Sequence, residues 1–160
     1  MLFRSSVQIG LKEVHKKSKK DDIVAIHDGV RPLIKESTIV ENIRIAKKYG
    51  NAMTVRSVTE TVVISKDKTA ESPDFKNRDD TYTLTSPQTF KVHELMLAYD
   101  DLNKQTSEPI LDSSLVYARL GKKVYIVKEQ ELNLKITTPE DFYYFRSILE
   151  LEEKKSIFGL

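Results

Sequence analysis

The stretch IVAIHDGVRP, residues 23–32, passes from an uninterrupted apolar run into a polar segment that contains Gly29 and Pro32. Four apolar residues without polar alternation predict a fully buried strand of the parallel type. Glycine and proline end the regular structure, so Asp28 and Arg31 follow the carboxyl end of that strand. Because ligands of α/β folds bind beyond the carboxyl ends of strands, the stretch predicts a candidate site at Asp28.

Patterns typical of helices and of strands alternate along the rest of the chain. The predicted helices are residues 6–17, a helix capped by Ser37 and ended by Gly50, a helix after Pro87 with the stripe Val92, Leu95, Met96, Tyr99 and Leu102, residues 112–120, and a last helix that begins at Pro139. The predicted apolar faces are Ile39, Val40, Ile43 and Ala46 after Ser37, and Phe142, Phe145, Ile148 and Leu149 in the last helix. Further strands are predicted at residues 52–58, 61–64 and 124–127. Together these elements predict an α/β sandwich.

Composition restricts the class of protein. The chain has 160 residues, which suits one domain, and its 26 Lys and Arg against 24 Asp and Glu give a net charge of +2, too balanced to indicate nucleic-acid binding. The absence of cysteine excludes disulfides, thiolate zinc sites and a cysteine nucleophile. No apolar run is long enough to cross a membrane, and the start of the chain does not resemble a signal peptide. A cytoplasmic location is the default expectation.

The polar segment after the first predicted strand offers groups for chemistry. The carboxylate of Asp28 can hold a divalent cation or orient a hydroxyl, Gly29 allows close backbone approach, and Arg31 can bind a phosphate through two parallel hydrogen bonds. The alternative is an Asp-Gly turn braced by an Arg–Asp pair. His27 closes an apolar strand, and this position favours a packed, hydrogen-bonded histidine over a catalytic base.

Two further segments carry candidate residues. Lys135 lies between Leu134 and Ile136 and would point to the opposite face of a strand, where its charge can stabilise a phosphoryl oxygen. The alternative is a solvated lysine on an edge strand. The other segment is Glu60-Thr61 together with Arg78 and Ser86-Pro87-Gln88-Thr89-Phe90, polar residues that on an extended arm would suit binding to a phosphate or a partner. The alternative is a turn-rich surface loop, and the polar residues 69–80 fit either interpretation.

These segments occur together in an order typical of one enzyme family. They are Ser6-Val7 with Gly10-Leu11, residues 27–32, Glu60-Thr61, Arg78, Ser86-Pro87-Gln88 and residues 133–141. The chain resembles the cytidylyltransferases that include 2-C-methyl-D-erythritol 4-phosphate cytidylyltransferase and ribitol-5-phosphate cytidylyltransferase. The resemblance implies one domain over residues 1–160, with a Rossmann-like mixed sheet flanked by helices and a protruding β-arm at residues 59–86. The strand and glycine-rich loop that hold CTP in the family have no counterpart here, so we expect the N-terminal part of the fold to be missing.

The resemblance implies transfer of CMP from CTP to a sugar-alcohol phosphate, with release of pyrophosphate and with Mg²⁺ as cofactor. The implied acceptor is 2-C-methyl-D-erythritol 4-phosphate, used in isoprenoid precursor synthesis. The alternative is ribitol 5-phosphate or a related polyol phosphate of teichoic acid or capsule synthesis. The implied roles are nucleotide binding for Ser6, Asp28 and Gly29, metal binding for Asp28, catalysis for Lys135, Asp28 and Arg31, and acceptor binding for Asp28, Arg31, Thr61, Arg78, Ser86 and Lys135.

The resemblance also implies a homodimer. Thr61, Arg78 and Ser86, which replaces the usual threonine, fall where family residues on an extended arm reach the acceptor phosphate of the neighbouring subunit. A second hypothesis belongs to another class of function. Without the glycine loop, the chain would be a catalytically silent dimerisation or acceptor-binding unit.

Overall fold

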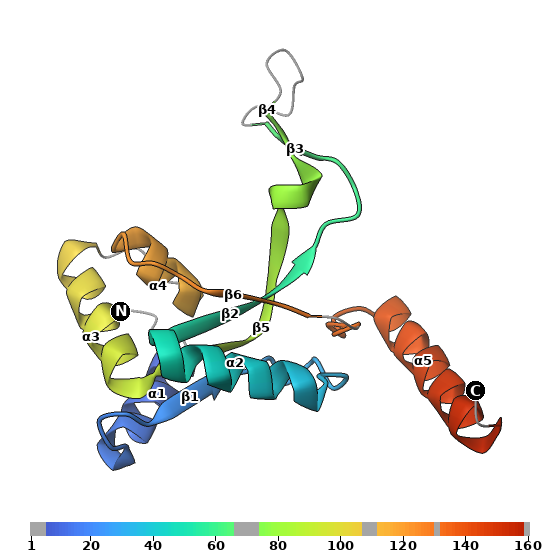
Figure 1. Ribbon diagram of the computed structural model, residues 1–160, viewed down its shortest axis with the longest axis horizontal. Coiled ribbons are helices and arrows are strands. Elements are labelled where there is room, and N and C mark those ends of the chain that lie inside the picture. Colours follow the sequence, from blue (N-terminus) through green and yellow to red (C-terminus); the bar gives the residue numbers. More distant parts are fainter. Residues whose placement is uncertain (1–5, 66–73, 107–111, 130–131, 159–160) are drawn as a thin grey trace.

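The computed structural model describes residues 6–65, 74–106, 112–129 and 132–158 (Figure 1). The predicted polar turn that follows residue 65 lies outside this part of the chain. The elements in chain order are α1 (Ser6–Lys17), β1 (Ile23–Ile26), α2 (Glu36–Tyr49), β2 (Asn51–Ser57), β3 (Val62–Ile64), β4 (Asp74–Lys76), the 3-10 helix η1 (Arg78–Asp80), β5 (Tyr82–Lys91), α3 (Val92–Gln105), α4 (Ser113–Arg119), β6 (Ile126–Lys128) and α5 (Pro139–Phe158). The predicted α/β class is confirmed, with a mixed sheet flanked by helices.

The main sheet has the strand order β1-β5-β2-β6. β5 is antiparallel to β1 and to β2, and β6 is parallel to β2. β1, β2 and β6 therefore run in one direction and present their carboxyl ends at the same edge. The prediction of a fully buried, parallel strand at residues 23–26 was wrong, because in the described part of the chain β1 is an edge strand that pairs with antiparallel β5 and leaves Ala25 exposed.

β5 is a strand that the sequence pattern did not predict. It carries Thr85, Ser86, Gln88 and Thr89, all of them buried, and Pro87 lies inside it. The pairing of β2 with β5 shifts register next to this proline, which is where a sheet tolerates a residue without an N–H. A polar sequence with an internal proline does not have a strand pattern, so this strand was not predicted.

Helices cover both faces of the sheet (Figure 1). α1, α3 and α4 pack with β2 and β5 in a core formed by Leu11, Met53, Phe90, Val92, Leu95, Ala98, Tyr99, Leu102, Val116 and Tyr117. α2 covers the opposite face, where Ala46 packs against Ala52 and Val127. These layers confirm the predicted helices and the buried stripe that begins at Val92.

The buried face of α2 differs from its prediction. Thr38, Asn42 and Ala46 are buried, whereas Val40 is 56% exposed. The buried Asn42 amide donates to the carbonyl of Thr38 and to Thr54 of β2, and these bonds allow a polar residue to occupy the core side. Ser37 lies inside the first turn instead of capping the helix. Gly50 ends the helix in the left-handed conformation, as predicted.

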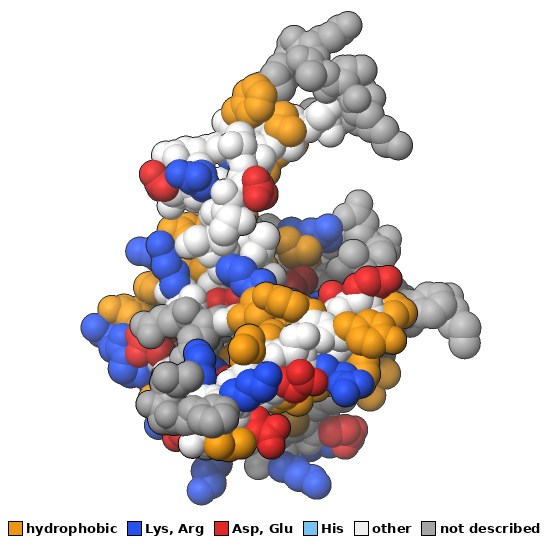
Figure 2. Space-filling view, turned by 90° about the vertical axis from the view of Figure 1, so that its right-hand side faces the viewer, with side chains coloured by type: hydrophobic (Ala, Val, Ile, Leu, Met, Phe, Trp, Pro, Cys, Tyr) orange, Lys and Arg blue, Asp and Glu red, His pale blue; other side chains and the backbone are white. Residues whose placement is uncertain are grey.

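Two parts of the chain project from the layered body (Figure 1). The first is the arm, which we define as the segment between β2 and β5; its hairpin of β3 and β4 exposes Val63, Ile64 and Phe75. The second is α5, whose predicted apolar face is exposed at Phe142 and Leu149. Figure 2 shows hydrophobic side chains both on the hairpin and on the face of the body that lies below it.

Among the described residues, the predicted α5 apolar face is thus only partly covered, with Phe145 and Ile148 half-buried. Lys35, in the segment before α2, forms an ion pair with Glu152 of α5 at 3.0 Å, which ties the helix to the body. Among the described residues, no helix is both long enough and apolar enough to cross a membrane.

Candidate active site

Four of the predicted site residues meet at the common carboxyl edge of β1, β2 and β6. Asp28 follows β1, and its Oδ2 lies 3.0 Å from Nε of Arg31 and 3.6 Å from Nζ of Lys135. The backbone N–H of Asp28 donates to Oγ of Ser86 at 3.1 Å. Residues from three distant parts of the sequence therefore meet at Asp28, two of them at its carboxylate and Ser86 at its backbone N–H.

Arg31 is held from two sides. Its backbone N–H donates to the carbonyl of Asp28, which closes a turn, and its Nε donates to the Asp28 carboxylate. Its Nη1 donates to the carbonyl oxygen of Asn133 at 2.7 Å, and its side chain is only 10% exposed. Arg31 therefore braces the turn, as one interpretation of the sequence held, and also ties the turn to the segment that carries Lys135.

Both ring nitrogens of His27 are hydrogen-bonded. Nε2 lies 3.0 Å from the carbonyl oxygen of Arg31, so this nitrogen carries the proton and donates. Nδ1 lies 3.0 Å from Oγ of Ser86, which in turn accepts from the backbone of Asp28. The network assigns the neutral tautomer in which Nδ1 accepts the Ser86 hydroxyl proton. His27 is hydrogen-bonded as its position predicted, but the prediction that it is packed was wrong, because the residue is exposed.

Lys135 lies in an extended segment that joins no sheet. Besides the bond from Arg31, Nδ2 of Asn133 donates to the carbonyl of Ser86 at 2.6 Å, and the N–H of Ile136 donates to the carbonyl of Val30 at 2.8 Å. Ile136 is partly buried, whereas the Lys135 side chain is 49% exposed. The predicted alternation is present, and it turns the ammonium toward Asp28 and solvent.

Three residues that the sequence did not single out complete this edge. Arg56 at the end of β2 donates through Nε to Glu129 at 2.5 Å and through Nη2 to the carbonyl of Asn133 at 3.1 Å. The second oxygen of Glu129 accepts from the hydroxyl of Thr85 at 3.0 Å. The available signal was an arginine at the end of a strand that is otherwise buried, but its partner is 73 positions away in sequence.

Other predicted site residues lie elsewhere. Thr61 and Arg78 are exposed on the arm, and Ser6 is exposed at the start of α1. Among the described residues, no hydrogen bond or ion pair joins these three to Asp28. A Cβ at Gly29 would meet no atom within 4 Å, so close packing does not require a glycine at this position. Ser86 lies in the central sheet, so the part of the arm that projects ends before it.

The carboxylate of Asp28 is suited to be one ligand of a magnesium ion that takes its other ligands from outside the protein. Only one oxygen of Asp28 contacts Arg31 and Lys135 in the described structure, which leaves the other available to a cation. Mg²⁺ is commonly held by one or two carboxylates together with substrate phosphates. Within the described ranges, no group of three or more His, Cys, Asp or Glu side chains could form a protein-only metal site.

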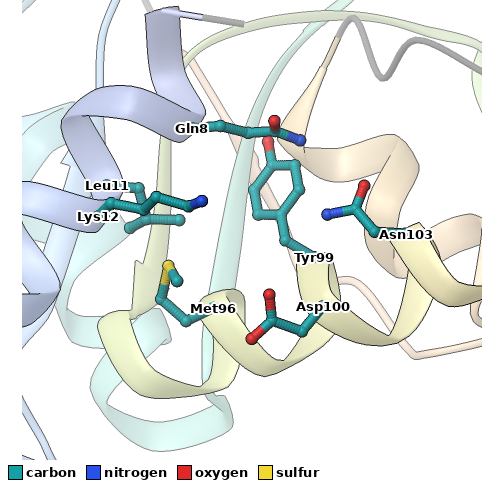
Figure 3. Close-up of a pocket in the computed structure, with 7 residues that line it drawn as sticks. All are labelled: Gln8, Leu11, Lys12, Met96, Tyr99, Asp100 and Asn103. Atoms are coloured by element: carbon teal, nitrogen blue, oxygen red, sulfur yellow. The ribbon is translucent and has the colours of Figure 1, made fainter. Parts of the chain in front are cut away.

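A separate pocket of about 150 Å³ lies between α1 and α3 (Figure 3). Lys12 extends from α1, and Asp100 and Asn103 extend from α3, around the ring of Tyr99. Burial raises the pKa of the Tyr99 phenol, whose oxygen is 3.0 Å from Oγ of Ser113. The pocket shares no residue with the cluster around Asp28.

The order of these residues and the architecture that brings them together match known proteins. The family model for 2-C-methyl-D-erythritol 4-phosphate cytidylyltransferase matches residues 3–151. The chain belongs to this family. The resemblance noted in the sequence is therefore confirmed.

Relatives and solved structures support the assignment. The chain is 33% identical over 155 residues to the ribitol-5-phosphate cytidylyltransferase of Streptococcus agalactiae serotype III, an overlap of 97% of this chain and 64% of the relative. It is 30% identical to the ribitol-5-phosphate cytidylyltransferase of Vibrio parahaemolyticus, with 98% of this chain and 65% of the relative covered. The structure of 4-diphosphocytidyl-2C-methyl-D-erythritol synthase from Anaerococcus prevotii superposes with a TM-score of 0.79 and 28% identity, over 91% of this chain and 65% of that one. The chain thus spans somewhat less than two thirds of the length of these proteins.

Proposed function

We propose that this chain takes part in the transfer of CMP from CTP to a sugar-alcohol phosphate. The observation that carries the proposal is the convergence of Asp28, Arg31 and Lys135 at the carboxyl edge of the sheet. Two cations and one carboxylate at such an edge suit a reaction between phosphates, and family membership supplies the reaction type.

In the proposed reaction, an oxygen of the acceptor phosphate attacks the α-phosphorus of CTP. A new P–O bond forms, the bond between the α-phosphorus and the bridging oxygen breaks, and pyrophosphate leaves. No covalent enzyme intermediate is needed, so the protein contributes positioning and charge stabilisation. Lys135, with its exposed ammonium, offsets negative charge that builds up on the α-phosphate, while Arg31 is held in place to bind a phosphate oxygen.

Asp28 would hold Mg²⁺, which when bound with CTP lowers the negative charge of the triphosphate. Ser6 and Gly29 remain proposals for nucleotide binding, on the strength of the family resemblance. Asp28 also fixes Arg31 and approaches Lys135, so it orients both cations whether or not it binds the ion.

The acceptor is a polyol phosphate, and ribitol 5-phosphate is the first candidate to test. The curated relatives at 33% and 30% identity are ribitol-5-phosphate cytidylyltransferases. 2-C-methyl-D-erythritol 4-phosphate is the second candidate, because it is named in the family description and a solved synthase with its name is 28% identical. We expect the reaction in the cytoplasm, where CTP is made.

We also propose that the arm forms a homodimer and brings Thr61 and Arg78 to the acceptor site of the partner subunit. Both residues are exposed on the arm, and among the described residues no hydrogen bond or ion pair joins them to Asp28 of their own chain. The hairpin beside them exposes Val63, Ile64 and Phe75, and an apolar projection of this kind suits a protein partner. Ser86, by contrast, would serve the site of its own chain. A strictly monomeric protein by analytical ultracentrifugation would refute this part of the proposal.

The activity is tested by incubating the purified chain with CTP, Mg²⁺ and each polyol phosphate in turn. Release of pyrophosphate together with a CDP-polyol product, detected by mass spectrometry, is the expected result. Calorimetry with CTP and Mg²⁺ tests the alternative, in which the chain is a catalytically silent dimerisation or acceptor-binding unit. Absence of both CTP binding and product would favour that alternative.

A further inference from the structure

Arg56 reaches the candidate active site from a strand that the family-based assignment does not use. Its Nη2 lies 3.1 Å from the carbonyl oxygen of Asn133, and Nη1 of Arg31 lies 2.7 Å from the same oxygen. The two donor nitrogens are thus at most about 6 Å apart, since each is bonded to one shared acceptor. Two guanidinium groups converge beside Asp28 and Lys135.

Glu129 holds Arg56 in this position. Its side chain is 2% exposed, and its two oxygens accept from Nε of Arg56 and from the hydroxyl of Thr85. The contact with Arg56 is made through Nε, at the side of the guanidinium, instead of through both terminal nitrogens. Nη1 of Arg56 has no partner among the described residues, and the Arg56 side chain is 38% exposed. The guanidinium is therefore fixed in direction and still has donors for a ligand.

The charges at this edge favour an anion. Arg31, Arg56 and Lys135 carry three positive charges, and Asp28 and Glu129 carry two negative ones. Because the Glu129 carboxylate is buried and both its oxygens are occupied, it neutralises Arg56 from behind without entering the site. An Arg–Glu ion pair with a purely structural role is most stable when two parallel hydrogen bonds join the guanidinium to the carboxylate. In the pair of Arg56 and Glu129, one of these two hydrogen bonds is replaced by the bond from Thr85 to Glu129.

We propose that Arg56 is a third cationic residue of the site and binds the phosphate of the acceptor. This inference rests on the proposed function and names a further residue for its substrate. Its direction follows from the strand order β1-β5-β2-β6. Gly29, proposed for the nucleotide, follows β1 at the sheet edge, whereas Arg56 lies across β5 on β2, where the chain leaves for the arm.

The test measures the affinity of the 160-residue chain for ribitol 5-phosphate and, separately, for CTP with Mg²⁺ by calorimetry. Arg56→Gln alone would leave the buried Glu129 carboxylate unpaired and could unfold the chain. The informative variant is therefore Arg56→Gln combined with Glu129→Gln, which removes both charges and keeps a hydrogen-bonding pair. The matched control is Arg44→Gln combined with Glu41→Gln, an exposed Arg–Glu pair on α2.

We expect the double variant at Arg56 and Glu129 to lose roughly ten-fold or more in affinity for ribitol 5-phosphate, because one charge-assisted hydrogen bond is lost. Its melting temperature and CTP affinity should stay close to those of the unchanged chain, and the control pair should change neither affinity. Unchanged affinity for ribitol 5-phosphate would overturn the inference, as would a parallel loss of both ligands with a lower melting temperature. If the unchanged chain binds neither ligand, the proposed function itself fails, and the inference with it.

Discussion

The ion pair of Arg56 and Glu129 makes a quantitative prediction, because its two members are buried to very different extents. The Glu129 side chain is 2% exposed and that of Arg56 is 38% exposed. Replacing Arg56 with methionine leaves a buried carboxylate with only the Thr85 hydroxyl as a partner. Replacing Glu129 with glutamine leaves a guanidinium that can turn to water, and the new amide can still bond to Thr85 and Arg56.

The expected costs follow from this asymmetry. Removing one partner of a buried ion pair lowers the free energy of unfolding by about 3–5 kcal/mol. We expect Arg56→Met to lower it by about 3 kcal/mol, because solvent reaches one side of the pair. Glu129→Gln exchanges a charge-assisted hydrogen bond for a neutral one and should cost about 1 kcal/mol. Arg56→Met should therefore be the more destabilising change by about 2 kcal/mol.

Urea unfolding followed by circular dichroism at neutral pH measures both variants. The stability of a domain is typically about 5–15 kcal/mol, so a loss of this size shifts the midpoint clearly without abolishing the fold. Arg44→Met, at an exposed pair on α2, serves as the control and should move the midpoint little. Equal losses for Arg56→Met and Glu129→Gln, or the reverse order, would refute the argument from burial.

Three further outcomes follow from other contacts. Gly50→Ala should lower stability by about 1–2 kcal/mol in urea unfolding, because Gly50 has a φ of 91° and a new Cβ would lie 2.6 Å from a Glu94 carboxylate oxygen; an unchanged midpoint would contradict this. The backbone N–H of Thr137 contributes most to lowering the pKa of Asp141. This contact therefore stabilises the start of α5 at pH values above the ordinary carboxyl pKa, and the stabilisation is lost as the pH falls through the lowered pKa of Asp141. An NMR titration should show this loss of helical structure at the start of α5, and Asp141→Asn should abolish its pH dependence. Lys135→Ala should leave stability nearly unchanged, since the ammonium is half exposed, while lowering affinity for CTP or acceptor roughly ten-fold; calorimetry showing full affinity would remove Lys135 from the proposed mechanism.

The sequence predicted most helices well, for a physical reason. The stripe from Val92 to Leu102 repeats at helical spacing, and Gly50 and Gly121 stop helices in left-handed conformations that glycine adopts readily. These signals are local, so they can be recognised without knowledge of the fold. The face of α2 was wrong because Asn42 is buried through bonds to Thr38 and Thr54, which hydrophobic periodicity does not register.

The main strand was missed because its stability depends on partners. In β5, Gln88 is buried by donating to Asp112 and accepting from the N–H of Ser114, at the start of α4. The hydroxyl of Thr54 donates to the carbonyl of Pro87 at 2.6 Å, inside the sheet. Burial of these polar side chains is favourable only when their hydrogen-bond partners are in place, and no pattern within residues 82–91 identifies those partners.

The sequence alone determined which candidate site residues are present and in which order they follow along the chain. The ordered set of segments from Ser6-Val7 to residues 133–141 indicated the family, although no single motif in it was decisive. Tertiary structure decided which of them meet. β5 runs antiparallel between β1 and β2, so it delivers Ser86 to Asp28 and leaves Thr61 and Arg78 on the arm. The pairing of Arg56 with Glu129 likewise exists only because parallel β2 and β6 end at the same edge, a relation across 73 residues that no local pattern contains.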